Sequence, residues 1–148
     1  MWHELLIGAV VSALSIALHA VAMTAVVQSA RKAATKAAAR HPALFLAAVM
    51  IAAVSVLMAA HVAEAGIWSL AYAMVGAAPA GADWMYFAFV NYTTLGYGDI
   101  LPTEEWRLLG PITAMNGVLL FGWSTAVMFD VLRAAMARGA SDADRQAA

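Results

Sequence analysis

Three things are missing or scarce in this chain of 148 residues, and each narrows its class. The chain has no cysteine, so disulfide and thiol chemistry are excluded and the redox compartment cannot be inferred. Only 11% of its residues are charged, against about 25% in soluble globular domains, while 64% are hydrophobic. No set of side chains arranged for enzyme catalysis is found. The composition therefore indicates a membrane protein that is not an enzyme.

Three apolar stretches are long enough to cross a hydrocarbon core of about 30 Å as helices. We expect these helices at residues 1–30, 43–75 and 104–133. The first stretch begins without the positive charge typical of a secretory signal, so we predict that it is retained. A basic loop (31–42) joins the first two helices, a short frayed tail (134–148) ends the chain, and no further domain is expected.

A segment too short to cross a bilayer lies between the second and third stretches. A glycine- and proline-containing run, 76–81, is expected to end the second helix. Asp83 can then cap a short helix over 83–92 by accepting hydrogen bonds from its first amides. Thr103 is expected to cap the third helix, and Gly139 to end it. Non-helical backbone at membrane depth needs protein or water around it, so this arrangement predicts a re-entrant segment beside a pore.

The basic residues predict how the chain is oriented. Four lie in 31–40 and three follow the third stretch, so that with three crossings all seven share one side and only Arg107 falls opposite. The positive-inside rule makes that side cytoplasmic and places the amino terminus outside. The acids expected on the outer half would either form a ring that concentrates cations or be merely solvated. These acids are Glu64, Asp83, Asp99, Glu104 and Glu105.

The most informative motif is residues 93–99, Thr-Thr-Leu-Gly-Tyr-Gly-Asp. Residues 94–98 differ from the potassium filter sequence Thr-Val-Gly-Tyr-Gly only by an aliphatic exchange at Leu95. The motif follows a short aromatic helix and lies between two apolar spans. In these features the chain resembles the potassium channel family, in its small prokaryotic type with one pore loop per subunit. The resemblance covers about residues 43–133 and leaves the first helix outside it.

The resemblance implies an all-α membrane protein with three transmembrane helices, a re-entrant pore helix and a selectivity-filter loop, assembled as a homotetramer in a lipid bilayer. It implies passive conduction of K⁺, with K⁺ ions in the filter and no organic cofactor. The backbone carbonyls of Thr94, Leu95, Gly96 and Tyr97, with the Thr94 hydroxyl, would bind K⁺. Gly96 and Gly98 supply the backbone freedom that such a filter needs. Leu95 and Tyr97 would turn their side chains outward against the pore helix.

Four residues are expected to support the filter, namely Thr93, Asp99, Tyr86 and Val90. Some members of the family carry a glutamate where this chain has Val90, so a buried carboxylate partner for Asp99 is absent here. Many members carry paired tryptophans where this chain has Tyr86-Phe87. We predict that Tyr86 can still donate a hydrogen bond to Asp99 across the back of the filter.

The third helix contains a candidate hinge and two candidate cavity faces. The resemblance places Gly117 at the hinge if one residue is missing after the filter. The first face comprises Phe121, Thr125 and Phe129. The second face, about 100° round the helix, comprises Asn116, Leu120 and Ser124. The sequence does not decide between the faces, and helix packing is an equal alternative for Asn116, Ser124 and the glycines. Phe129 is a candidate hydrophobic constriction.

Ionisable residues inside the apolar stretches form a second candidate site. His61 and Glu64 are three residues apart and share a helix face, and His19 lies deep in the first stretch. They could form a satisfied hydrogen-bonded pair, a polar cluster supporting the filter through residues 91–93, a proton-sensitive gate or a metal site.

The sequence thus predicts a potassium-selective channel subunit. The first helix has no row of arginines, so no voltage sensor of the usual kind is expected. The predicted location is the plasma membrane, or the inner membrane of a bacterium, with the carboxyl terminus cytoplasmic and no nucleic-acid partner. The alternatives are a weakly selective cation channel and a non-conducting regulatory or metal-binding membrane protein.

Overall fold

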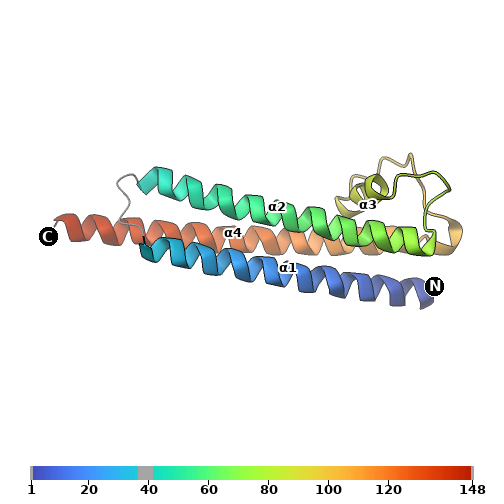
Figure 1. Ribbon diagram of the computed structural model, residues 1–148, viewed down its shortest axis with the longest axis horizontal. Coiled ribbons are helices and arrows are strands. Elements are labelled where there is room, and N and C mark those ends of the chain that lie inside the picture. Colours follow the sequence, from blue (N-terminus) through green and yellow to red (C-terminus); the bar gives the residue numbers. More distant parts are fainter. Residues whose placement is uncertain (1, 37–41, 148) are drawn as a thin grey trace. The chain divides into compact units, whose positions relative to one another are not determined.

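A computed structural model describes residues 2–36 and 42–147 (Figure 1). Its elements are α1 (Trp2–Lys36), α2 (Pro42–Val75), α3 (Trp84–Tyr92), the 3₁₀ turn η1 (Glu104–Trp106) and α4 (Leu109–Ala147). No strand occurs among the described residues. Three stretches are long and apolar enough to cross a membrane, namely Trp2–Lys32, Ala43–Val75 and Glu104–Ala134. The described chain is therefore all-helical and suited to a membrane.

The chain divides into two compact units, and each contains parts of α1, α2 and α4. The first unit comprises Met1–His19 and Ala60–Gly122, and the second comprises Ala20–Ala59 and Trp123–Ala148. Within the first unit, Figure 1 shows α3 and the loop that follows it beside the C-terminal part of α2. The motif at residues 93–99 thus belongs wholly to the first unit.

The core of the first unit is aromatic and is built around α3. Trp68 and Tyr72 of α2 pack against Phe87 and Tyr92 of α3, and all four side chains are buried. The Tyr72 hydroxyl donates to Thr113 Oγ1 of α4 at 2.5 Å. The core of the second unit is aliphatic and comprises Met23, Val26, Ala53, Leu57, Val127 and Val131. The large aromatic rings therefore gather where the short helix must be positioned.

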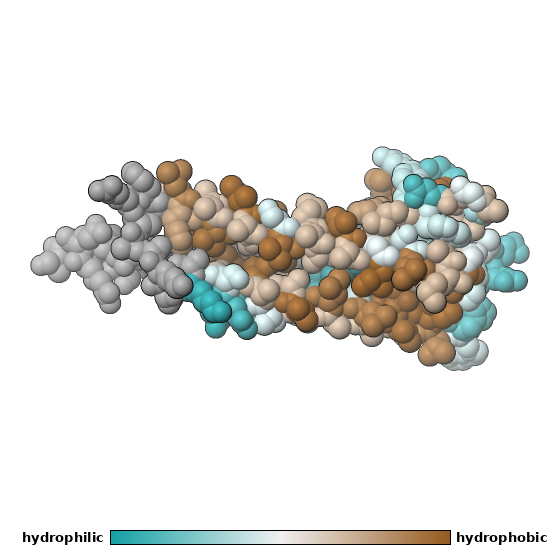
Figure 2. All heavy atoms as spheres, viewed as in Figure 1, coloured by the Kyte–Doolittle hydropathy of each residue, from teal (hydrophilic) through white to brown (hydrophobic). Residues whose placement is uncertain are grey.

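Many large apolar side chains are exposed on the long helices. They include Leu6, Val21, Ile51, Leu70 and Leu119. Figure 2 shows apolar residues (brown) on the viewed face of each unit. Soluble monomers rarely expose so much contiguous apolar surface, and a bilayer removes the cost of doing so. The exposed apolar surface therefore agrees with the helix lengths in indicating a membrane protein.

The ends of α3 and α2 form as the sequence predicts. Asp83 Oδ1 accepts hydrogen bonds from the amides of Met85 and Tyr86 at 2.9 and 3.0 Å, which confirms the predicted cap. α2 ends at Val75, Gly76 has φ +67°, and the Ala77 amide donates to the Tyr72 carbonyl at 3.0 Å. This is the hydrogen-bond pattern of a glycine-terminated helix.

The prediction of a basic loop over 31–42 is wrong for its first half, which is helical. α1 continues through Arg31 and Lys32 to Lys36, because alanine, lysine and arginine all have high helix propensity. α2 begins at Pro42, in the first turn, where a missing amide costs nothing. The remaining loop residues, 37–41, lie outside the described residues.

Both predicted ends of the third helix also need correction. α4 begins at Leu109 rather than 104, and the Thr103 side chain makes no capping hydrogen bond. Pro111, which lacks an amide hydrogen, then falls in the first turn, where helix amides have no internal partner. Gly139 does not end α4, which continues to Ala147. An interior glycine costs a helix only about 1 kcal/mol relative to alanine, so it need not terminate one.

Candidate functional site

Residues 93–99 form a loop that starts at the C-terminal end of α3. The Thr94 amide donates to the Asn91 carbonyl at 3.0 Å, and the Leu95 and Gly96 amides donate to the Val90 carbonyl at 3.0 and 3.3 Å. These bonds pair carbonyls that the end of a helix leaves unsatisfied. Within the described chain, the carbonyls of 94–98 accept no backbone hydrogen bond. The first three of these loop amides therefore face α3, and the carbonyls of 94–98 stay free of backbone hydrogen bonds within the described chain.

The sign of φ alternates along the loop. It is +61° at Thr94, +59° at Gly96 and +77° at Gly98, with negative values at Leu95 and Tyr97 between them. Glycine adopts positive φ at little cost, but a β-branched residue such as threonine rarely does. Such a conformation costs about 1–3 kcal/mol and occurs mostly at functional sites. Alternating handedness turns successive amides to one side and leaves the carbonyls on the other.

The side chains of Leu95 and Tyr97 do not lie as the sequence interpretation expected. They are 53% and 69% exposed, so α3 of their own chain leaves much of both side chains uncovered. α3 already buries Phe87 and Ala88 in the core shared with α2. In the single chain the loop therefore leaves two large side chains uncovered.

The predicted hydrogen bond between Tyr86 and Asp99 is present. The Tyr86 hydroxyl donates to Asp99 Oδ2 at 2.6 Å and so joins the start of α3 to the end of the loop. This bond, helped by the amides of Asp99 and Ile100, holds the pKa of the Asp99 carboxyl below its ordinary value. Val90 is buried and supplies no carboxylate, as the sequence states. Its backbone carbonyl instead accepts the hydrogen bonds from the amides of Leu95 and Gly96.

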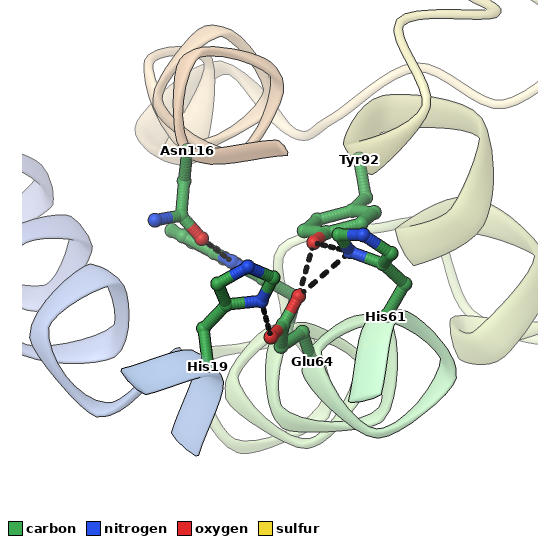
Figure 3. A network of polar contacts seen from close by, with 6 residues as sticks. His19, His61, Glu64, Tyr92 and Asn116 are labelled. Carbon is green, nitrogen blue, oxygen red and sulfur yellow. Dashed lines mark hydrogen bonds and ion pairs between the residues drawn. The ribbon is translucent and has the colours of Figure 1, made fainter. Parts of the chain in front are cut away.

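Behind the loop, side chains from α1, α2 and α3 converge on one buried carboxylate (Figure 3). Glu64 of α2 is 0% exposed, and its Oε1 accepts a hydrogen bond from His19 Nδ1 of α1 at 2.7 Å. Glu64 Oε2 accepts from His61 Nδ1 at 3.0 Å and from the Tyr92 hydroxyl. His61 Nδ1 also lies 2.8 Å from the Tyr92 hydroxyl oxygen. We call His19, His61, Glu64 and Tyr92 the Glu64 cluster.

The Glu64 cluster corrects one expectation and agrees with another. Glu64 is not among the solvated acids of an outer mouth, because three neighbouring helices enclose its side chain. The expected contact between the His61–Glu64 pair and residues 91–93 exists, through Tyr92. The consequences of that contact for the loop stay a prediction.

Gly117 of α4 allows a close backbone contact with α3. A Cβ added at Gly117 would lie 2.0 Å from the Tyr92 carbonyl oxygen, which no side chain can tolerate. α4 is one uninterrupted helix through this position. The structure therefore gives Gly117 a packing role, and the hinge inferred from the resemblance stays a prediction.

The two candidate faces of α4 differ in burial. Asn116, Leu120 and Ser124 are all buried within the chain, and Asn116 Oδ1 accepts from Trp68 Nε1 of α2 at 3.1 Å. Phe121 is half-buried, Thr125 is exposed and Phe129 is 58% exposed. The Asn116 face thus packs against other helices of the same chain. On the other face, Phe121 packs against His61 and Tyr92, whereas Thr125 and Phe129 are exposed.

Two contacts of α1 were beyond the reach of sequence reasoning. The pairing of His19 with Glu64 joins residues 45 apart, and the carboxylate of Glu4 accepts from the Leu108 amide, 104 residues away, at 3.0 Å. The only available signal was an ionisable residue in an apolar stretch, which indicates a partner without naming it. Through these contacts α1 joins the packing of the first unit.

Comparison with known families gives one match. A family model described as an ion channel matches residues 48–134, more than half of the chain, from α2 through the loop to α4. Comparisons with curated proteins and with solved structures gave no match. The matched segment contains the short helix, the loop with alternating φ and two of the three apolar helices. The chain therefore belongs to the ion channel family.

Proposed function

We propose that the chain is a subunit of a potassium-selective channel and that residues 93–99 form its filter. The observation that carries this proposal is the alternating φ at Thr94, Gly96 and Gly98, in a loop whose carbonyls accept no backbone hydrogen bond within the described chain. Threonine in a strained conformation needs a compensating function. Coordination of a dehydrated cation by aligned carbonyls is such a function.

The loop re-enters the membrane in this proposal. α3 has nine residues and at 1.5 Å per residue spans about 14 Å, so it cannot cross a core of about 30 Å. K⁺ loses water as it enters and regains oxygen contacts from the carbonyls of Thr94, Leu95, Gly96 and Tyr97 and from the Thr94 hydroxyl. Asp99, held by Tyr86, closes the outer end of the loop.

A homotetramer supplies the remaining oxygens. One chain contributes one loop, and a ring of carbonyls around an axis needs several copies related by rotation. The uncovered side chains of Leu95 and Tyr97 support this assembly, because neighbouring subunits would enclose them. The face of α4 with Phe121, Thr125 and Phe129 then lines the cavity below the filter.

The orientation follows from the basic residues. Arg31 and Lys32 of α1 and Arg133 of α4 lie in the second unit, whereas Arg107 lies in the first, with the loop. We place Arg31, Lys32 and Arg133 on the cytoplasmic side of the plasma membrane, or of the inner membrane of a bacterium, and the amino terminus outside. The filter then opens to the exterior.

Purified protein in liposomes tests the proposal. Potassium trapped inside the liposomes should drive passive uptake of rubidium, and barium should block this uptake. Gly96→Ala should abolish it, because the added methyl group opposes the positive φ at this position. In planar bilayers, reversal potentials between potassium and sodium solutions should follow the potassium gradient. A reversal potential midway between the equilibrium potentials of potassium and sodium would instead indicate a weakly selective cation channel. Wild-type protein without flux would indicate a non-conducting membrane subunit.

A further inference from the structure

We infer that the Glu64 cluster is a binding site for one first-row transition-metal dication of the zinc type. Four donor atoms from three helices meet there, namely Nδ1 of His19, Nδ1 of His61, a carboxylate oxygen of Glu64 and the hydroxyl oxygen of Tyr92. This inference goes beyond conduction of K⁺, because the ion would lie behind the loop and not in it.

The distances between the donor atoms fit a small ion. The two imidazole nitrogens and the carboxylate oxygen all lie within 4.8 Å of one another. Zinc bonds of about 2.0–2.1 Å in a tetrahedron separate their donor atoms by about 3.3 Å. His61 Nδ1 lies 3.0 Å from Glu64 Oε2 and 2.8 Å from the Tyr92 hydroxyl oxygen, and these separations need only a few tenths of an ångström to open to that value. His19 Nδ1 lies 2.7 Å from the other carboxylate oxygen, Oε1.

The chemistry of the donors selects the class of ion. Two imidazoles and a carboxylate are ligands typical of zinc and its first-row neighbours. Calcium and magnesium prefer sites made wholly of oxygen, and Cu⁺ prefers sulfur. All four side chains are buried, with His61 the most exposed of them at 9%.

The Glu64 carboxylate supplies the negative charge to which a cation in the cluster would bind. Glu64 carries the only formal negative charge of the four side chains, and a carboxylate at membrane depth is costly without compensation. A dication bound by this carboxylate leaves one positive charge. Each imidazole keeps one proton, which moves from Nδ1 to Nε2 as the metal takes the Nδ1 lone pair.

A bound ion would act on the loop through Tyr92. This residue ends α3, its carbonyl lies against Gly117 of α4, and Thr93 and Thr94 follow it directly. An ion held by His19 of α1 and the α2 pair would fix Tyr92, and with it the start of the loop. Ser15, one turn before His19 on α1, is fully buried, and its hydroxyl has no hydrogen-bond partner in the described chain. It places a further oxygen on this face of α1.

The test uses the full chain, purified in detergent without a histidine tag. After equilibration with Zn²⁺ and removal of excess, wild-type protein should retain about one zinc ion per chain. Co²⁺ in its place should give the visible absorption of a four-coordinate centre. His19→Asn and Glu64→Gln should lower zinc affinity by about tenfold or more. His3→Asn is the matched control, because His3 is exposed and outside the cluster.

Two further measurements test the inference even if a variant of a buried residue fails to fold. Zinc should raise the thermal midpoint of wild-type protein, and a chelator should reverse that rise. Tyr92→Phe should retain cobalt with an altered spectrum. If wild-type protein retains no zinc, the cluster is a hydrogen-bonded network and not a metal site. Equal retention in His19→Asn and Glu64→Gln would show surface binding. Either result overturns the inference, whereas rubidium flux of zinc-free protein tests the proposed function separately.

Discussion

Tyr92 is held at both of its polar ends. Its hydroxyl donates to Glu64 inside the cluster, while its carbonyl lies against the α-carbon of Gly117. Its ring also packs edge-on against Phe121 of α4, with ring centroids 5.4 Å apart. A residue with so many contacts has one position, and the loop begins at the next residue. At the residue scale, we therefore expect Tyr92 to set the position at which the loop starts.

The Gly117 contact makes a direct prediction. Gly117→Ala should destabilise the protein by about 1–3 kcal/mol, because the new methyl group would overlap the Tyr92 carbonyl and force backbone to move. Thermal unfolding in detergent micelles measures this. Gly122→Ala is the control: its Cβ would meet nothing within 4 Å, so the change should stabilise α4 by about 0.5–1 kcal/mol. Equal effects in both variants would contradict the packing role.

The bond between Tyr86 and Asp99 predicts a pH dependence. Because the pKa of Asp99 is lowered in the folded protein, the bond contributes stability above the ordinary carboxyl pKa, and that contribution is lost as the pH falls through the lowered value. Tyr86→Phe should move the pKa of Asp99 upward. A carbon NMR titration of the Asp99 carboxyl measures it, with Asp99→Asn identifying the signal. An unchanged titration in Tyr86→Phe would show that the tyrosine is not the main cause.

At the scale of whole elements, α1 contacts the first unit at three levels. His3 packs edge-on against Trp106 with ring centroids 4.9 Å apart, Glu4 accepts from the Leu108 amide at 3.0 Å, and His19 reaches Glu64. Between them Gly8 gives close access to Ile112 of α4. The helix that lies outside the family match thus supports both the start of α4 and the back of the loop.

Close packing at Gly8 can be tested by a paired substitution. A Cβ at Gly8 would lie 2.8 and 2.9 Å from two carbons of Ile112, whose branched side chain cannot easily move away. Gly8→Ala should therefore cost about 1–3 kcal/mol in thermal unfolding. The double variant with Ile112→Ala should recover part of that loss. Gly66→Ala, which would meet only the tip of Met85 at 4.0 Å, should show no such loss. A double variant no better than Gly8→Ala would argue against this contact.

Sequence patterns predicted the helices and the loop better than they predicted the contacts between residues far apart in the chain. Long apolar runs, the Asp83 cap and the glycines after Val75 are local signals, and they gave the helices and the loop. The end of α1 at Lys36 and the passage of α4 through Gly139 were missed, because alanine-rich flanks outweigh one glycine or a few charges. The partners of His19 and Glu4 lie 45 and 104 residues away and leave no periodic trace. The position of Glu64 inside an apolar stretch did indicate a buried polar pair with His61, but not the third partner, His19.

At the scale of the whole molecule, the proposed assembly accounts for surface that a single chain leaves open. Leu95 and Tyr97 project from the loop, and Phe129 is exposed on α4. Tyrosine is favoured where one end of a side chain is apolar and the other polar, as at contacts between subunits. In the proposed assembly, lipid would cover the apolar outer helices, and neighbouring copies of the chain would cover these residues.

Tyr97 provides a test of that assembly. If neighbouring subunits bury its ring, Tyr97→Ala should weaken the tetramer by about 3–5 kcal/mol per chain, the usual cost of removing a buried aromatic ring. The temperature at which the tetramer separates on detergent gels measures this. Leu70→Ala, at an equally exposed position on α2, should leave that temperature unchanged. A wild-type protein that migrates as a monomer or dimer would contradict the assembly itself.

The position of His19 also restricts how the protein could be shortened. An engineer seeking a minimal two-helix pore would delete residues 1–30, yet this deletion strips Glu64 of its α1 partner and bares a carboxylate to hydrocarbon. Truncation therefore has to be combined with an apolar replacement such as Glu64→Leu, after which the Tyr92 hydroxyl keeps His61 Nδ1 as its hydrogen-bond partner. The first helix is removable only as part of a coordinated redesign.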